Sequence, residues 1–128
     1  MTEALFEHVN YTVSDPDATA AMLVEIFGWK VRWTGPSLGD GYTVHVGTAE
    51  RYIALYTPKN APETLDDTST SRRGAINHIG VLVGDLDAAE ARVKAAGYKT
   101  HSHQEYEPGK RFYFHDRDQI EYEVVSYN

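Results

Sequence analysis

Apolar and polar residues alternate shortly after the N-terminus, in the way typical of a strand with one buried face. In residues 6–14 the apolar positions of this alternation are Val9, Tyr11 and Val13. The same pattern returns 70 positions later, in residues 79–83. We therefore predict two related strands, each with one apolar face and one polar face.

A helix signal follows each of these strands. Asp15 can cap a helix with its side chain, and Pro16 then occupies the first helical position. Gly28 suits the left-handed residue that ends a helix. In the second half Asp85 can act as the cap and Gly97 as the end. The sequence therefore predicts one helix in each half of the chain.

Three shorter alternating runs follow each predicted helix. They are residues 29–34, 42–46 and 52–56 in the first half, and 98–103, 111–115 and 120–127 in the second. His8 and His78 also coincide when the halves are aligned, which indicates an internal repeat. We predict an α+β fold of two βαβββ modules, residues 1–57 and 76–128. The linker, residues 58–75, is rich in Pro, Asp, Ser and Thr.

The strand period of two places polar and aromatic side chains on the sheet faces that the helices do not cover. These residues are His8, His45, Tyr52, Tyr56, His78, Arg111, Tyr113, and Glu121 or Glu123. So many such groups on one surface favour a lined cavity. Two imidazoles and one carboxylate would also suit an octahedral divalent metal that keeps three positions open. A single histidine on a strand is more often a half-exposed side chain with a protein partner.

Composition and charge narrow the function classes. The 128 residues are 41% hydrophobic and 24% charged, which is ordinary for one globular domain. The absence of cysteine excludes disulfides and thiolate metal sites. A net charge of −7 argues against nucleic-acid binding. We see no signal peptide and no apolar run of membrane-spanning length, so we expect a cytoplasmic protein without membrane contact.

These residues resemble the vicinal oxygen chelate superfamily, which includes glyoxalases, bleomycin-resistance proteins and extradiol dioxygenases. The resemblance covers nearly the whole chain as a single domain, residues 1–128. Residues 116–123 resemble the family's Asp-Pro-Asp-Gly turn followed by a metal-binding glutamate. In this chain Arg117 replaces the proline and Gln119 replaces the glycine. By that count Glu123 is the ligand, and Glu121 is not.

The resemblance implies a curled mixed sheet around an open cup, with a metal held by His8, His78 and Glu123. The repeat places Ala54 at the position equivalent to Glu123, where glyoxalase I-like members carry a second glutamate. Its absence argues against glyoxalase I activity and resembles the three-ligand site of extradiol dioxygenases. Tyr113 lies where those enzymes place an active-site tyrosine, although we favour the interpretation that it is an ordinary aromatic residue beside the cavity.

Two functions from different classes follow from this resemblance. The favoured one is a dioxygenase-like or lyase-like metalloenzyme that uses Fe(II) or Mn(II), or alternatively Zn or Ni, on a small substrate with neighbouring oxygens. Tyr113 and His45 would then be catalytic, and the substrate would contact Trp33, Tyr52, Tyr56 and Arg111. The alternative is a metal-free protein that binds a small molecule such as an antibiotic, with Trp29 added to the aromatic set. An inactive relative is a third reading. We expect a homodimer in each case, because sheet edges need covering.

Overall fold

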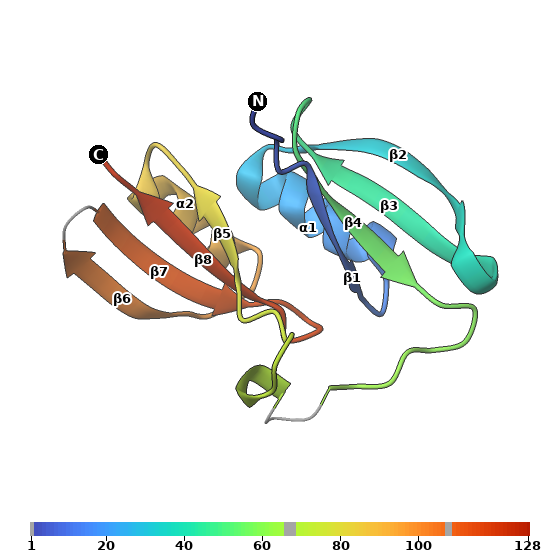
Figure 1. Cartoon of the computed structure of the whole chain (residues 1–128). Coiled ribbons are helices and arrows are strands. Elements are labelled where there is room, and N and C mark those ends of the chain that lie inside the picture. Colours follow the sequence, from blue (N-terminus) through green and yellow to red (C-terminus); the bar gives the residue numbers. More distant parts are fainter. Residues whose placement is uncertain (1, 66–68, 107–108) are drawn as a thin grey trace. The chain divides into compact units, whose positions relative to one another are not determined.

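The computed structural model describes residues 2–65, 69–106 and 109–128. The chain divides into two compact units, Met1–Glu63 and Thr64–Asn128, which we call unit 1 and unit 2. Each unit consists of a four-stranded mixed sheet and one helix in the order βαβββ (Figure 1). The predicted α+β fold with two modules is therefore confirmed.

Unit 1 begins with a strand that ends up beside the last strand of the same unit. Its elements are β1 (His8–Thr12), α1 (Pro16–Phe27), β2 (Lys30–Ser37), the 3-10 turn η1 (Leu38–Asp40), β3 (Gly41–Gly47) and β4 (Tyr52–Thr57). The strand order is β1-β4-β3-β2. β1 and β4 are parallel, and the other neighbours are antiparallel. The connection between these parallel neighbours therefore contains α1, β2 and β3.

Unit 2 repeats this topology. Its elements are the 3-10 turn η2 (Ser69–Ser71), β5 (Ile79–Leu82), α2 (Leu86–Ala95), β6 (Thr100–Tyr106), β7 (Gly109–His115) and β8 (Glu121–Ser126). The strand order is β5-β8-β7-β6, with β5 and β8 parallel. The predicted internal repeat is therefore a repeat of structure as well as of sequence.

Both helices start at the predicted caps. Asp15 accepts a hydrogen bond from the backbone N–H of Ala18 at 3.1 Å, and Asp85 accepts one from Ala88 at 3.0 Å. Gly28 has a φ of 71°, in the left-handed region, and its N–H donates to a carbonyl of the last helical turn. Local signals alone therefore account for the limits of α1 and for the start of α2.

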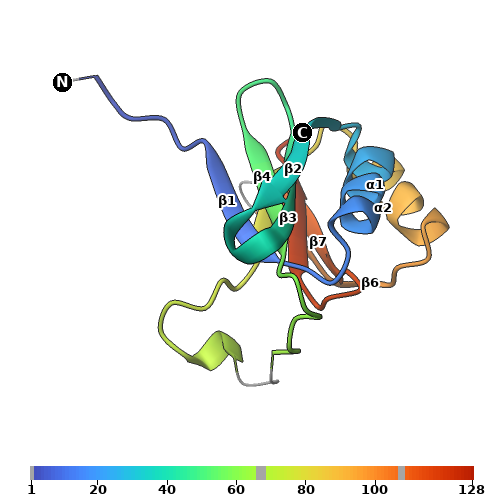
Figure 2. The same ribbon diagram turned by 90° about the vertical axis from the view of Figure 1, so that its right-hand side faces the viewer.

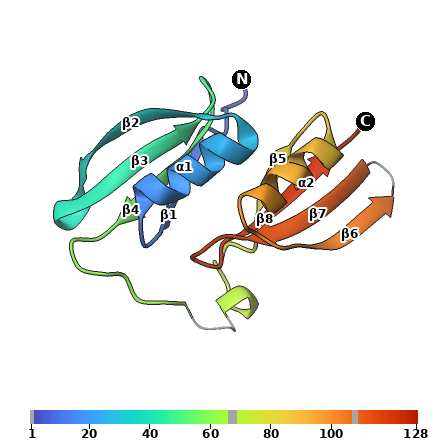
Figure 3. The ribbon, with the colours of Figure 1, turned by 180° about the vertical axis from the view of Figure 1, so that it is seen from behind.

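The core of each unit lies between its helix and one face of its sheet (Figure 3). The largest fully buried apolar side chains are Val13, Leu23, Ile26, Val44, Val46 and Leu55 in unit 1, and Val93, Phe112, Phe114, Tyr122 and Val124 in unit 2. The strand faces predicted to meet the helices are thus the buried ones. The polar faces are left on the opposite side, which we call the open face of each sheet.

Some predicted strand limits are wrong. β2 continues to Ser37 and β6 to Tyr106, because both strands keep pairing with the next strand of their hairpin after the alternation is lost. The last strand was predicted to begin at Ile120. Instead β8 begins at Glu121, and Ile120 is half-buried in the preceding turn. Its carbonyl there accepts a hydrogen bond from the backbone N–H of Asp116.

The ends and connections carry little regular structure. The segment that leads into β1 extends away from the unit 1 sheet, with Leu5 and Phe6 exposed (Figure 2). Most described residues of the predicted linker are exposed, and residues 66–68 of that linker lie outside the described part of the chain. Within the described ranges, neither helix has the length and apolar character needed to cross a bilayer.

Candidate functional site

The open face of unit 2 brings together two of the three predicted metal ligands. Glu123 on β8 pairs with Tyr113 of β7 on one side and with Gly80 of β5 on the other. His78 immediately precedes β5, and its Nε2 lies 3.5 Å from Glu123 Oε2. The strand register therefore fixes the position of Glu123, and His78 reaches it from the residue directly before β5.

Two further side chains converge on the same carboxylate. The Tyr113 hydroxyl donates a hydrogen bond to Glu123 Oε2 at 2.6 Å. Arg111 Nη1 lies 3.5 Å from Glu123 Oε1. The side chains of Glu123 and Arg111 are only 15% and 12% exposed, so these contacts stabilise a largely buried charge. We call His78, Arg111, Tyr113 and Glu123 the Glu123 cluster.

The Glu123 cluster fixes the protonation of Tyr113. The hydrogen bond to Glu123, followed by burial, raises the pKa of the Tyr113 hydroxyl to about 12. A phenol with such a pKa keeps its proton at neutral pH. Tyr113 is therefore a hydrogen-bond donor on the open face.

Both predicted metal-binding histidines have the same arrangement with the residue before them. His8 Nδ1 lies 2.9 Å from Glu7 Oε1, and His78 Nδ1 lies 3.0 Å from Asn77 Oδ1. Carboxylate and amide oxygens only accept hydrogen bonds, so each Nδ1 carries the proton. In the neutral form of each ring, Nε2 would then have the lone pair that a metal-binding imidazole needs.

The open face of unit 1 carries a row of ring systems. His8 stacks on Tyr52 with ring centroids 4.8 Å apart, and Tyr52 stacks on His45 at 4.6 Å. Trp33 contacts the other side of His45 at 5.0 Å. We call His8, Tyr52, His45 and Trp33 the aromatic row. The Arg32 guanidinium lies 4.4 Å from the centre of the Tyr52 ring, in a cation–π contact.

Two predicted aromatic contacts lie apart from this row. Tyr56 shares the open face by register, but its hydroxyl donates to the carbonyl of Leu38 at 3.0 Å in η1. Trp29 contacts Phe27 at the end of α1 instead. Trp33 and Tyr52 are therefore the predicted substrate-contacting residues that the aromatic row includes.

His45 is held in its neutral form. Burial lowers the pKa of the imidazole below its usual value, and the nearby His8 and Arg32 side chains lower it further. A neutral imidazole at physiological pH can accept a proton. The residue predicted to be a proton carrier thus has the protonation state that this role needs.

The strand registers show how the two modules correspond. In unit 2 Glu123 pairs with Tyr113, and in unit 1 Ala54 pairs with His45. Ala54 is thus the structural counterpart of Glu123, as the repeat predicted, and it offers no donor atom. His45 is likewise the counterpart of Tyr113. The two predicted catalytic residues therefore occupy equivalent positions of the repeat.

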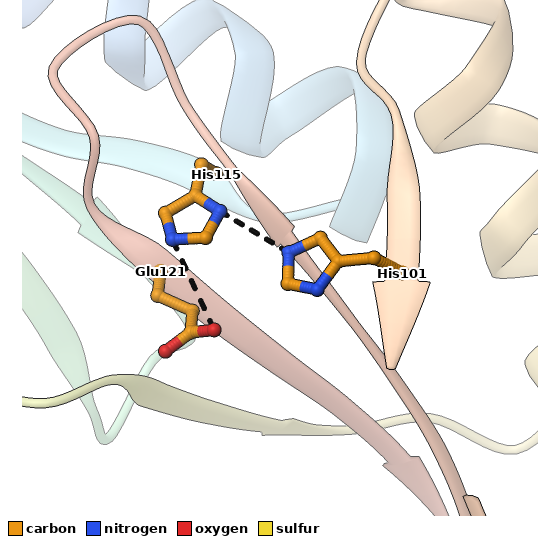
Figure 4. Close-up of side chains that lie close together, drawn as sticks. All are labelled: His101, His115 and Glu121. Carbon is orange, nitrogen blue, oxygen red and sulfur yellow. Dashed lines mark hydrogen bonds and ion pairs between the residues drawn. The ribbon is translucent and has the colours of Figure 1, made fainter. Parts of the chain in front are cut away.

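The open face of unit 2 also carries a group that the sequence analysis did not predict. His101, His115 and Glu121 come from three adjacent strands, and one ligand atom of each lies within 4.8 Å of the others (Figure 4). The strand alternation placed Glu121 on this face, but the family's turn gave the metal-binding role to Glu123 instead. His101 could not be placed reliably, because β6 changes its alternation directly after it.

A β-bulge causes that change in alternation. His101 pairs with Tyr113, but the next paired residue of β6 is Gln104, opposite Arg111, so β6 has one extra residue. Ser102 within the bulge has a φ of 56°, which is unusual for a residue other than glycine. His101 consequently stays on the open face, whereas His103 turns toward α2 and contacts Glu90 at 2.6 Å.

Comparisons with known proteins agree with this architecture. Residues 7–114 match the family model described as Glyoxalase/Bleomycin resistance protein/Dioxygenase superfamily. A glyoxylase/bleomycin resistance protein/dioxygenase domain from Frankia sp. EAN1pec is 25% identical with a TM-score of 0.81, covering 99% of this chain and 94% of that one. The fosfomycin resistance protein FosX from Listeria monocytogenes, complexed with Mn(II) and sulfate, is 19% identical with a TM-score of 0.71 and coverages of 98% and 93%. No protein of curated function matches the sequence.

Proposed function

The chain belongs to the Glyoxalase/Bleomycin resistance protein/Dioxygenase superfamily, and from this premise we propose that it is a metal-dependent enzyme acting on a small organic substrate with two neighbouring oxygens. The observation that carries the proposal is the pair formed by His78 Nε2 and Glu123 Oε2, 3.5 Å apart. Donors that share one metal ion, each at about 2.0–2.2 Å, lie about 3–3.5 Å from each other. The pair therefore fits a divalent ion.

We propose His8 as the third ligand. The support is its position in the repeat, equivalent to His78, and the protonated Nδ1 that leaves its Nε2 free to coordinate. Two imidazoles and one carboxylate suit Fe(II) or Mn(II), with Zn(II) and Ni(II) as alternatives. The Mn(II) complex of FosX, a protein of the same fold, agrees with this choice.

A divalent ion at this site would polarise two substrate oxygens as a Lewis acid or activate dioxygen. The surrounding side chains would position and protonate the substrate. Tyr113, which keeps its proton, would turn its single O–H from Glu123 to a substrate oxygen once Glu123 binds the ion. His45, which stays neutral, would accept a proton.

Arg111 would bind an oxygen of the substrate. Its Nε is buried and has no hydrogen-bond partner among the described residues. Burying such a donor unpaired costs about 1–3 kcal/mol, so a ligand oxygen that accepts from it would recover that free energy. The proximity of Arg111 to Glu123 places this donor beside the proposed metal ligand.

Ala54 limits the chemistry that we propose. A proton shuttle of the glyoxalase I type would need a carboxylate at this position, opposite His45. Alanine there leaves a three-ligand set, which resembles that of extradiol dioxygenases. We therefore propose oxygen or Lewis-acid chemistry on a catechol or 2-hydroxy ketone, and not the isomerisation of a hemithioacetal.

The aromatic row supports a second candidate, a metal-free protein that sequesters a small cationic ligand. The guanidinium of Arg32 already lies on Tyr52, which shows that this ring accepts a cation on its face. The negative net charge of −7 would favour a cationic ligand. In this candidate Trp33 and Tyr52 would stack on the ligand, and no metal would be retained.

Metal reconstitution separates the two candidates. Tag-free protein should be loaded anaerobically with Fe(II), and catechol should then change the optical or paramagnetic signal of the metal. His78→Ala and Glu123→Ala should abolish this response, whereas Glu105→Gln on exposed β6 should keep it. Oxygen consumption after admission of air would support the dioxygenase chemistry. A wild-type protein that retains no metal and shows no catechol response would overturn the proposal in favour of the binding protein.

A further inference from the structure

We propose that His101, His115 and Glu121 form a second metal site, which takes a divalent transition-metal ion such as Zn(II). The three residues lie on β6, β7 and β8 within unit 2 (Figure 4). None of them belongs to the ligand set of the proposed function. The inference therefore stands independently of that function.

The donor atoms already lie close to the spacing of ligands around one ion. His101 Nε2 and His115 Nδ1 are 3.1 Å apart, within the range of about 3–3.5 Å expected for two donors that share an ion. Glu121 Oε1 lies 3.9 Å from the other ring nitrogen of His115, Nε2. One ligand atom of each of the three residues lies within 4.8 Å of the others, so the carboxylate must move closer to complete a set of two nitrogens and one oxygen.

The backbone holds the three residues in this arrangement. His115 and Glu121 face each other directly in the β7–β8 register. His101 pairs with Tyr113, which is the same-face neighbour of His115, so His101 lies diagonally across from His115. The bulge at Ser102 follows immediately, and it keeps His101 on the open face while the next histidine faces α2. The cluster is thus set by strand pairing.

The ring of His101 is also held from its other side. His101 Nδ1 lies 2.9 Å from the Ser102 hydroxyl, which can accept a hydrogen bond from Nδ1–H in the tautomer whose Nε2 has a lone pair. The rings of His101 and His115 stack at 5.0 Å with an interplanar angle of 15°. An ion would replace the hydrogen bond between the two rings with little change in their positions.

The site is separate from the Glu123 cluster. Glu121 contacts His115, whereas Glu123 contacts His78, Arg111 and Tyr113, so the two carboxylates belong to different groups of side chains. The site is also open to ions from solvent, because the side chains of His115 and Glu121 are 41% and 24% exposed. Imidazole nitrogens favour Zn(II), Cu(II), Fe(II) or Ni(II) over Mg(II) or Ca(II).

Zinc titration by calorimetry tests the proposal on the tag-free full chain. The site variant is His101→Ala/His115→Ala, and the matched control is His103→Ala, which removes a histidine of the same strand that faces α2. The wild type and the control should show the same number of Zn(II) ions per chain. The site variant should bind one fewer. Binding by the site variant that equals the wild type in number and affinity would overturn the proposal.

Two further variants make the result of the zinc titration unambiguous. Glu121→Gln preserves the size of the side chain but removes its charge, and it should weaken the same binding event by about tenfold or more. If His101→Ala/His115→Ala fails to fold, Glu121→Gln is measured in its place. An unchanged Zn(II) affinity of Glu121→Gln would count against the site. His78→Ala/Glu123→Gln should leave the event intact. Loss of Zn(II) in that variant alone would support the proposed function and reject the second site. Loss of Zn(II) in His101→Ala/His115→Ala alone would support the second site and reject the proposed function.

Discussion

The hydroxyl of Tyr113 donates to the carboxylate of Glu123 across the β7–β8 pair, at the register where His45 faces Ala54 in the other module. One copy of the repeat thus has a donor and a carboxylate at this position, and the other has an imidazole and a methyl group. The two modules keep the same backbone but have diverged in chemistry.

The first prediction concerns the hydrogen bond of Tyr113. Tyr113→Phe removes a donor from a carboxylate that is only 15% exposed, and we expect a loss of about 1–3 kcal/mol in the free energy of unfolding. Urea denaturation of the metal-free protein measures it. Tyr106→Phe is the control, because Tyr106 is an exposed aromatic of β6. Equal stability of both variants would show that the hydrogen bond contributes nothing net.

The second prediction concerns the register of β8. Glu121 and Glu123 lie on the same face, yet only Glu123 contacts His78. Glu123→Ala should abolish the catechol response of the Fe(II)-loaded protein, and Glu121→Ala should leave it unchanged. The spectrum of the metal reports the difference directly. If Glu121 proved necessary and Glu123 dispensable, the assignment of the ligand by the family's turn would be wrong.

The sequence predicted the parts of this site that depend on regular alternation. His78 and Glu123 could be placed on one face because β5 and β8 follow the period of two without interruption. The cap of α1 by Asp15 was equally predictable, because an N-cap is a local signal. The repeat then located Ala54 opposite His45, which the strand register confirms.

The sequence could not predict what depends on irregular backbone or on pairing across strands. Ser102 adopts a positive φ without being glycine, asparagine or aspartate, so nothing in the sequence marks the bulge. The face of His101, and hence its contact with His115, follows from that bulge. The buried Nε of Arg111 was also unpredictable, because its burial depends on the neighbouring strands.

The third prediction concerns the pH dependence of stability through Glu90. Burial opposes its ionisation, but hydrogen bonds from Thr100 and His103 outweigh burial and lower the pKa of Glu90 below its usual value of 4.5. A carboxylate with a lowered pKa stabilises the fold above pH 4.5, and this contribution disappears as the pH falls through the folded-state pKa. Glu90→Gln should therefore destabilise the protein at pH 7 and have a smaller effect at pH 3.

Urea denaturation at the two pH values measures this difference. Glu105→Gln is the control, because the Glu105 side chain is 75% exposed on β6 and should change stability by less than about 0.5 kcal/mol. An effect of Glu90→Gln that grew as the pH fell would contradict the direction of the pKa shift. The contacts of Glu90 on α2 would then be less important than the structure suggests.

The fourth prediction concerns assembly. Within each sheet the outer strands are β1 and β2 in unit 1, and β5 and β6 in unit 2. The unpaired backbone N–H and C=O groups of an exposed edge strand can pair with another chain, so proteins usually cover such edges. We expect a homodimer at micromolar concentration, with twice the chain mass of 14.4 kDa by light scattering. A monomer mass would contradict this expectation.

The last prediction concerns the missing fourth ligand. Ala54 is only 2% exposed, so Ala54→Glu places a carboxylate in a buried position beside His45. Without metal, this unpaired charge should lower the free energy of unfolding by several kcal/mol or raise the pKa of the new carboxyl group. With a divalent ion, the carboxylate becomes a fourth donor. Metal should therefore stabilise the variant more than it stabilises the wild type.

Ala54→Gln separates coordination from size. Glutamine has the shape of glutamate but no charge, so it should perturb the packing around His45 without restoring a fourth anionic ligand. Thermal denaturation with and without Mn(II) should therefore show a large metal-induced stabilisation for Ala54→Glu and a small one for Ala54→Gln. The glutamate should also suppress oxygen consumption, because it occupies a position that the substrate or dioxygen needs. Equal metal-induced stabilisation of the two variants would mean that position 54 does not face the metal, and the three-ligand proposal would then fail.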